Sequence, residues 1–273
     1  MFHVEHRRSP LCKNNMSKII AIANQKGGVG KTTTSINLSS SLTINDQSVL
    51  LIDMDPQSNA TSGVGIDSKS LSHSLYDCLM RGNPLSEAVC QTAVPRLWVV
   101  PATADLVGAE VELVHVEERE SVLKKSLLAM TDRYDYIIID CPPALGFLTI
   151  NALAAADSVL VPVQCEYYAM EGLGRLMANV KRIQDGLNPS LELEGILLTM
   201  FDSRNSLARQ VSEEIRTHFK EKVYKTMIPR NVTLAEAPSY GQPAAFYNAA
   251  SAGAQAYLEL AKEVLAHGEE SSR

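Results

Sequence analysis

The segment with the clearest chemical signature lies near the start of the 273-residue chain, where glycines, lysines and hydroxyl side chains crowd together. Its residues are Lys26, Gly27, Gly28, Val29, Gly30, Lys31, Thr32 and Thr33. Glycines let a backbone turn its N–H groups around phosphate oxygens, and the start of a following helix adds a positive dipole end. In such a loop Lys31 reaches the β- and γ-phosphates, and the Thr32 hydroxyl holds Mg²⁺. The stretch therefore predicts a phosphate-binding loop (P-loop) with ATP and Mg²⁺ as ligands.

The loop departs from the standard spacing GxxxxGK[ST] at one position. Gln25 stands where the first glycine belongs, and the loop instead begins with a second lysine, Lys26. Spacing alone leaves open whether Lys26 acts on a nucleotide or is a solvated surface lysine.

Aspartates follow two apolar runs at the points where these runs end. Asp53 and Asp55 follow the run 49–52, and Asp140 follows the run 136–139. A carboxylate held at the end of a buried strand can bind Mg²⁺ through a water molecule, and we assign this role to Asp140. Asp53 either shares the metal or stabilises its strand end. Asp55, in a loop fixed by Pro56, is the candidate for orienting the attacking water.

The elements that must position these residues are short β-branched runs alternating with longer segments of helical period. The predicted strands are 19–23, 49–52, 97–100, 136–139, 159–163, 196–199 and 223–228. The predicted helices are 32–45, 105–130, 169–187, 206–221 and 249–266. Several runs are apolar at consecutive positions, which indicates strands covered on both faces. The pattern predicts an α/β P-loop NTPase fold, with a mostly parallel twisted sheet of about seven or eight strands and helices on both faces.

We expect one ATPase domain over residues 17–267, preceded by an N-terminal extension (1–16) and followed by a short tail (268–273). Met16 is an alternative start. The five cysteines form no CxxC pair, which favours a reducing cytoplasm. No run of about 18 apolar residues occurs, so no membrane span is predicted.

The formal net charge of −6 means that nucleic-acid binding would need a local basic patch. Residues 201–230 hold seven basic side chains against four acidic ones, the richest candidates being Arg204, Arg209 and Arg216. On a helix over 206–221, Arg209 and Arg216 lie opposite the apolar positions. The alternative is an ordinary solvated helix face.

Five motifs stand in a characteristic order along the chain. They are the P-loop, DxDPQ at 53–57, DCPP at 140–143, QCEYYAMEG at 164–172 and IPRN at 228–231. Over nearly all of residues 18–266 the chain resembles the ParA/Soj family of ATPases, whose P-loop is a deviant Walker A motif.

The resemblance implies roles that the residues alone do not establish. Lys26 would reach across a homodimer to the partner's phosphates, and Asp55 would be needed for hydrolysis. Pro229 and Asn231 would border the adenine base. Basic residues of the C-terminal region would bind double-stranded DNA without sequence preference in the ATP-bound dimer. Thr233 departs from the pattern, because many relatives carry an arginine there.

The implied function is ATP hydrolysis in chromosome or plasmid partitioning, stimulated by a ParB-type centromere-binding partner. The protein would be cytoplasmic and nucleoid-associated, without stable membrane association. One alternative is a MinD-like ATPase that cycles on membranes, but residues 254–273 carry four glutamates against Lys262 and Arg273, which disfavours anionic lipid. Another is a metabolic ligase or amidase of the same fold, which would need an additional substrate pocket.

Overall fold

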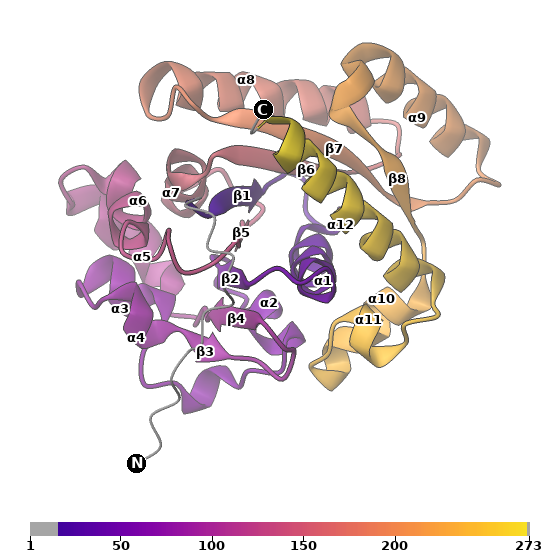
Figure 1. The fold of residues 1–273 in the computed structure, drawn as a ribbon. Helices are drawn as coiled ribbons and strands as arrows, with labels where there is room; N and C mark the ends of the chain where they lie inside the picture. Colours follow the sequence, from indigo (N-terminus) through magenta and orange to yellow (C-terminus); the bar gives the residue numbers. More distant parts are fainter. Residues whose placement is uncertain (1–15, 272–273) are drawn as a thin grey trace.

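The strands form one eight-stranded sheet in the order β3-β4-β2-β5-β1-β6-β7-β8 (Figure 1). The computed structural model describes residues 16–271, so most of the predicted N-terminal extension and the end of the tail lie outside the described residues. The strands are β1 Lys18–Ile22, β2 Val49–Asp53, β3 Cys90–Gln91, β4 Leu97–Val100, β5 Tyr136–Asp140, β6 Ser158–Gln164, β7 Glu192–Phe201 and β8 Val223–Pro229. All neighbours pair in parallel except β3 with β4. The predicted mostly parallel sheet is confirmed.

Helices cover both faces of this sheet. The long ones are α1 Lys31–Ile44, α8 Ala169–Gly186, α9 Ser206–Phe219 and α12 Ala252–Ser271. The shorter ones are α2 Asn59–Gly63, α3 Leu75–Met80, α4 Leu85–Ala88, α5 Leu106–Glu112, α6 Val122–Leu127, α7 Phe147–Ala155, α10 Val232–Glu236 and α11 Ala244–Tyr247. Figure 1 shows α12 passing over α1 on one side, with α7 and α8 beyond the strands on the other.

Two hydrophobic cores follow from the alternation of side chains along each strand. In β1, Ile19 and Ala21 join a core that contains residues of α5 to α9. Ile20 and Ile22 join a second core with residues of α1 and α12. Because both faces are buried, the strands are apolar at consecutive positions, as the sequence predicted.

The helix α1 is buried along almost its whole length between the sheet and α12. Its composition is not that of an ordinary core helix, because hydroxyl side chains dominate it. Ser40 Oγ donates to the carbonyl of Asn37 at 3.1 Å, so this hydroxyl is satisfied within the helix. Small side chains allow α12 to approach α1 closely, and this packing holds the end of the P-loop.

The predicted helix over 105–130 is wrong. The chain there forms α5, two 3₁₀ turns at Leu113–His115 and Arg119–Ser121, and then α6. Val116 has extended backbone angles and Glu118 a φ of 51°, so the helix cannot continue through them. Leu113 and Leu123, which lie on either side of the break, are both fully buried. The sequence prediction also omitted β3 and α7.

Candidate nucleotide site

The P-loop lies between β1 and α1, where the sequence placed it. Gly28 and Gly30 have φ values of 74° and 87°, in the left-handed region that favours glycine. The amide of Thr34 donates to the carbonyl of Gly30 at 2.9 Å and starts the helical hydrogen bonding. Gly27 and Gly28 are exposed, so the loop is open to a ligand from solvent.

The two lysines of the loop face different ways. The side chain of Lys31 is buried, and its Nζ donates to the carbonyl of Lys26 at 3.1 Å. Burial lowers the pKa of Lys31, and the charge of Asp140 opposes that shift. The side chain of Lys26 is about half exposed and forms an ion pair with Glu166, which follows β6. Lys31 is therefore directed into the loop, whereas Lys26 is presented on its outer side.

Asp140 lies at the end of β5, fully buried, beside Asp53 at the end of β2. Ser35 Oγ donates to Asp140 Oδ1 at 2.8 Å, but Oδ2 is buried without a partner. Burial, and next the charge of Asp53, raise the pKa of Asp140, while the hydrogen bond from Ser35 and the nearby hydroxyl of Thr32 lower it. The structure thus brings the two predicted metal residues, Thr32 and Asp140, together. An unsatisfied carboxylate oxygen beside a hydroxyl fits an outer-sphere contact to hydrated Mg²⁺.

Both carboxylate oxygens of Asp53 accept hydrogen bonds from residues that follow β2 in the chain. Oδ1 accepts from the amide of Asp55 at 3.1 Å, and Oδ2 accepts from the amide and hydroxyl of Thr61 at 2.8 and 2.7 Å. The hydroxyl of Thr61 in turn accepts from the amide of Ala102 at 3.0 Å. Burial raises the pKa of Asp53, and the bonds from Thr61 oppose that shift. This arrangement favours the strand-end role of Asp53 over direct metal binding.

Asp55 is held in place by this network but keeps acceptor capacity. It is 8% exposed, and its Oδ1 accepts from the amide of Gln57 at 3.0 Å. Its charge acts on both Lys31 and Asp140, so it lies on the nucleotide side of the sheet's carboxyl edge. The geometry is compatible with the predicted role in orienting water, which stays a prediction.

Of the predicted adenine residues, Pro229 is the last residue of β8 and Asn231 lies two residues later, and both are linked to the P-loop through β7. Thr199 Oγ1 donates to the carbonyl of Val29 at 2.8 Å, and Phe201 pairs with Pro229. Asn231 precedes α10, and its Oδ1 is buried without a partner. The P-loop and the segment 229–231 are therefore positioned by the same strand.

The three predicted DNA-binding arginines lie in the loop after β7 and on α9. Arg204 is bound to Asp202, Arg209 donates to the carbonyl of Ser203 at 2.9 Å, and Arg216 donates to the carbonyl of Lys225 at 3.3 Å. The inner face of α9 consists of Ala208, Val211, Ser212 and Ile215. Arg204 and Arg209 are exposed, whereas Arg216 is half-buried beside β8, and the role of the three arginines in DNA binding stays a prediction.

Three residues that bear on this site were not identified from the sequence: Ser35, Thr61 and Glu166. Ser35 could have been found, because it lies one helical turn after Lys31 and shares its face. Thr61 and Glu166 come from other segments, and no spacing in the sequence connects them to Asp53 or Lys26.

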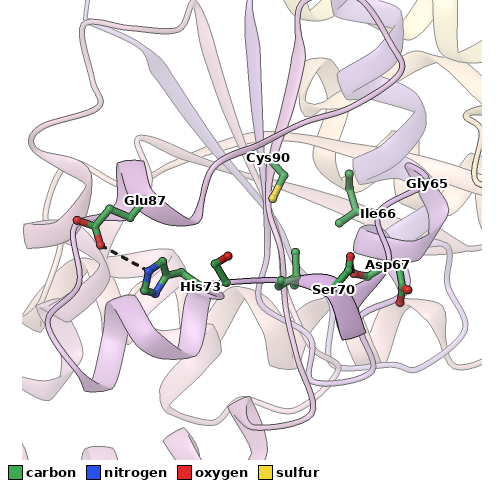
Figure 2. A pocket seen from close by; sticks show the side chains of 9 residues that line it. Gly65, Ile66, Asp67, Ser70, His73, Glu87 and Cys90 are labelled. Carbon is green, nitrogen blue, oxygen red and sulfur yellow. Dashed lines mark hydrogen bonds and ion pairs between the residues drawn. The ribbon is translucent and has the colours of Figure 1, made fainter. Parts of the chain in front are cut away.

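A cavity of about 480 Å³ lies away from these residues (Figure 2). It is lined by Gly65, Ile66, Asp67, Ser70, Leu71, Ser72, His73, Glu87 and Cys90. Figure 2 shows His73 directed toward Glu87, with their Nε2 and Oε2 atoms 4.0 Å apart. Among residues 16–271, no group of three or more His, Cys, Asp or Glu side chains could hold a metal ion. None of the predicted ATP-binding residues lines this cavity.

A parallel sheet, a glycine loop leading into a helix and an aspartate on the adjacent strand define a nucleotide-binding protein of the P-loop class. Comparison with known proteins identifies the family within this class. A family model described as an AAA domain matches residues 17–193. The chain is 56% identical over 253 residues to the sporulation initiation inhibitor protein Soj of Bacillus subtilis, covering 93% of this chain and 100% of Soj. It is 53% identical over 250 residues to the chromosome partitioning protein ParA of Myxococcus xanthus, covering 92% and 88% of the two chains.

Among solved structures, the cobyrinic acid a,c-diamide synthase of Mycobacterium smegmatis with ADP and magnesium superposes with a TM-score of 0.83. The two are 37% identical, and the match covers 94% of this chain and 97% of the synthase. The identities to Soj and ParA over almost the whole chain decide the assignment. The chain belongs to the Soj/ParA family of chromosome-partitioning ATPases.

Proposed function

We propose that this chain is an ATP-switched partitioning protein for a chromosome or plasmid. It binds ATP with Mg²⁺, pairs with a second copy of itself, and then binds double-stranded DNA without sequence preference. A ParB-type partner stimulates hydrolysis and ends the cycle. The observation that carries the proposal is the opposite placement of the loop lysines, Lys31 inside and Lys26 on the exposed outer side. A cation presented outward can serve the nucleotide of a molecule docked against that face.

Within one subunit, the P-loop amides and Lys31 bind the phosphates, and Pro229 and Asn231 border the adenine. Thr32 and, through water, Asp140 would hold Mg²⁺, which supplies charge neutralisation at the phosphates when bound. The unpartnered Asp140 Oδ2 gives this role its physical support. Fixed positions matter here, because phosphoryl transfer is catalysed mainly by positioning and electrostatics.

Hydrolysis would begin with a water molecule that donates a hydrogen bond to Asp55 and attacks the γ-phosphorus. The bond to the bridging oxygen breaks, and that oxygen leaves with ADP. Lys26 of the second copy would neutralise charge that develops on the transferred group. A cation supplied in this way is worth about 10³–10⁵ in rate in related phosphoryl transfers. Asp53 acts indirectly, because its bonds to Asp55 and Thr61 fix the loop that carries Asp55.

The proposed DNA surface consists of Arg204 in the loop before α9, Arg209 on α9, and the half-buried Arg216 on the same helix. With at most three contacts per subunit, a dimer would neutralise no more than about six phosphates and lose up to roughly 10³ in affinity between about 50 and 200 mM salt. One subunit alone would bind poorly, so dimerisation gates DNA binding. In this proposal the ATP-bound dimer is therefore located on the nucleoid, in the cytoplasm.

The membrane-cycling alternative has less support. No helix among residues 16–271 is both long and apolar enough to cross a bilayer. A peripheral helix would need a free apolar face, but Ala254, Tyr257, Leu260, Ala261 and Val264 of α12 are buried in the core with α1. The ligase or amidase alternative has less support, because the 56% and 53% identities to Soj and ParA exceed the 37% identity to the diamide synthase.

One co-sedimentation experiment separates these readings. The full chain is mixed with random-sequence duplex DNA or with anionic liposomes, in the presence of ATP and Mg²⁺, of ADP and Mg²⁺, or without nucleotide. We expect pelleting with DNA only in the ATP sample, and its loss at high salt. Pelleting with liposomes but not DNA would support the membrane reading, and DNA binding independent of ATP and salt would contradict the proposed switch.

A further inference from the structure

Arg204 carries an internal counter-ion. Its Nε donates to Asp202 Oδ1 at 2.9 Å and its Nη2 donates to Oδ2 at 2.8 Å, so the guanidinium and the carboxylate meet edge to edge. A guanidinium binds carboxylate and phosphate oxygens in the same two-bond geometry. The face that Arg204 would offer to a DNA phosphate is therefore already occupied.

The carboxylate is fixed by its place in the fold. Asp202 follows directly after β7, and its Oδ1 also accepts from the amide of Arg204 at 3.0 Å. The amide of Asn205 donates to the carbonyl of Asp202 at 3.0 Å, and Asn205 then caps α9. This turn holds Asp202 beside Arg204 through the backbone, independently of the ion pair.

Asp202 remains charged at any physiological pH. The hydrogen bonds from Arg204, and to a smaller extent the charge of Arg230, lower the pKa of Asp202 to about 2. Arg230 lies next to the proposed adenine residues, and its amide donates to the carbonyl of Phe201 at 3.3 Å. Asp202 thus stands between the proposed nucleotide segment and the proposed DNA surface.

We propose that Asp202 competes with DNA phosphate for Arg204 and so limits the DNA affinity of the ATP-bound dimer. The inference rests on the proposed function, in which Arg204 contacts DNA. When DNA binds, a phosphate replaces the carboxylate as the partner of the guanidinium. The carboxylate stays nearby and cancels about one positive charge per subunit. Arg204 then contributes little to the net charge that drives binding, and release of DNA is correspondingly easy.

The test is Asp202→Asn. Asparagine keeps an oxygen that accepts from the amide of residue 204, so the turn and the α9 cap are retained while the charge is lost. Glu213→Gln is the matched control, since it removes one carboxylate from the neighbouring helix α9, where Glu213 is exposed and forms no ion pair with another described residue. Arg204→Ala and the double variant Asp202→Asn/Arg204→Ala complete the set.

Binding of the full-length variants to a labelled random-sequence duplex is followed by fluorescence anisotropy with a non-hydrolysable ATP analogue and Mg²⁺. We expect Asp202→Asn to bind about two- to fivefold more tightly per subunit than wild type, the range that an exposed ion pair allows. The slope of log K against log salt should steepen by about 0.9 per subunit, because one more phosphate is neutralised. A merely structural role for Asp202 would not steepen this slope.

The double variant should show no gain beyond that of Glu213→Gln, because the competition needs Arg204. If Asp202→Asn matches Glu213→Gln in affinity and slope, or binds more weakly than wild type, the inference is overturned. It is also overturned, with the proposed function intact, if wild type binds DNA and Arg204→Ala binds equally well. If wild type shows no ATP-dependent DNA binding at all, the proposed function itself fails.

Discussion

The substitution Lys26→Gln tests whether Lys26 acts on the nucleotide of the second subunit or only stabilises the fold of its own subunit. In the single chain the Lys26 ammonium makes one ion pair, with Glu166, and both side chains are nearly half exposed, at 45% and 46%. Pairs of that exposure contribute less than about 1 kcal/mol to the free energy of unfolding. The melting temperature should therefore change little.

The proposed role across the dimer predicts a far larger effect on turnover. Loss of a cation at the γ-phosphate corresponds to about 10³–10⁵ in rate, or roughly 4–7 kcal/mol of transition-state stabilisation. ATP turnover per subunit is measured against protein concentration, with dimer formation followed by light scattering. Wild type should show turnover that rises with concentration, and Lys26→Gln should lose this rise.

Lys181→Gln is the matched control, because Lys181 is also an exposed lysine in an ion pair, with Asp185 at 2.8 Å, but lies on α8. It should behave as wild type. If Lys26→Gln retains both ATP-dependent dimerisation and turnover, the outward lysine has no function across the dimer, and the reasoning from its placement is refuted.

Three further outcomes can be checked on single variants. Asp55→Asn should reduce turnover by about 10²–10⁴ while ATP-dependent dimers persist in light scattering, and an unchanged turnover would exclude Asp55 as the residue that orients water. Burial raises the pKa of Asp140 to about 8, so between about pH 4 and pH 8 this carboxyl binds fewer protons in the unfolded chain than in the native one. The stability of the nucleotide-free protein should therefore fall as pH rises, and urea titrations of Asp140→Asn should show a flatter dependence. Thr199→Val leaves the carbonyl of Val29 without its 2.8 Å hydrogen bond, which should cost about 1–3 kcal/mol of stability in denaturant titrations and weaken ATP binding.

The fold was largely predictable because its signals are local. Consecutive apolar residues mark strands covered on both faces, and runs such as 136–139 place β5 within one residue of its observed end at Asp140. The segment 105–130 was not predictable in this way. It contains no proline, its helical period continues through the break, and no residue type at the turn predicts the φ of 51° that Glu118 adopts.

In the nucleotide site, too, some residues could be predicted from local sequence and others could not. The P-loop and the aspartates at the ends of β2 and β5 follow from residue type and place in the chain. Their partners do not, because Ser35, Thr61 and Glu166 meet them only through the sheet order and the loops that cross it. Likewise, in the sequence Asp202 is only one of the acidic residues that reduce the positive charge of residues 201–230. In the structure its carboxylate binds one particular arginine of that segment, Arg204.

The burial of α1 has a consequence for how motion is distributed in the molecule. A helix enclosed by the sheet and α12 cannot open without disrupting the core, so its amides should exchange with solvent only on global unfolding. The P-loop leads directly into that helix, so the helix also restrains the P-loop. Lys26 and Arg204 must change partners during the proposed cycle. Both lie on exposed segments, where a rearrangement costs little free energy. In the nucleotide site, the exposed Lys26 and the buried helix α1 are thus separated by only a few residues.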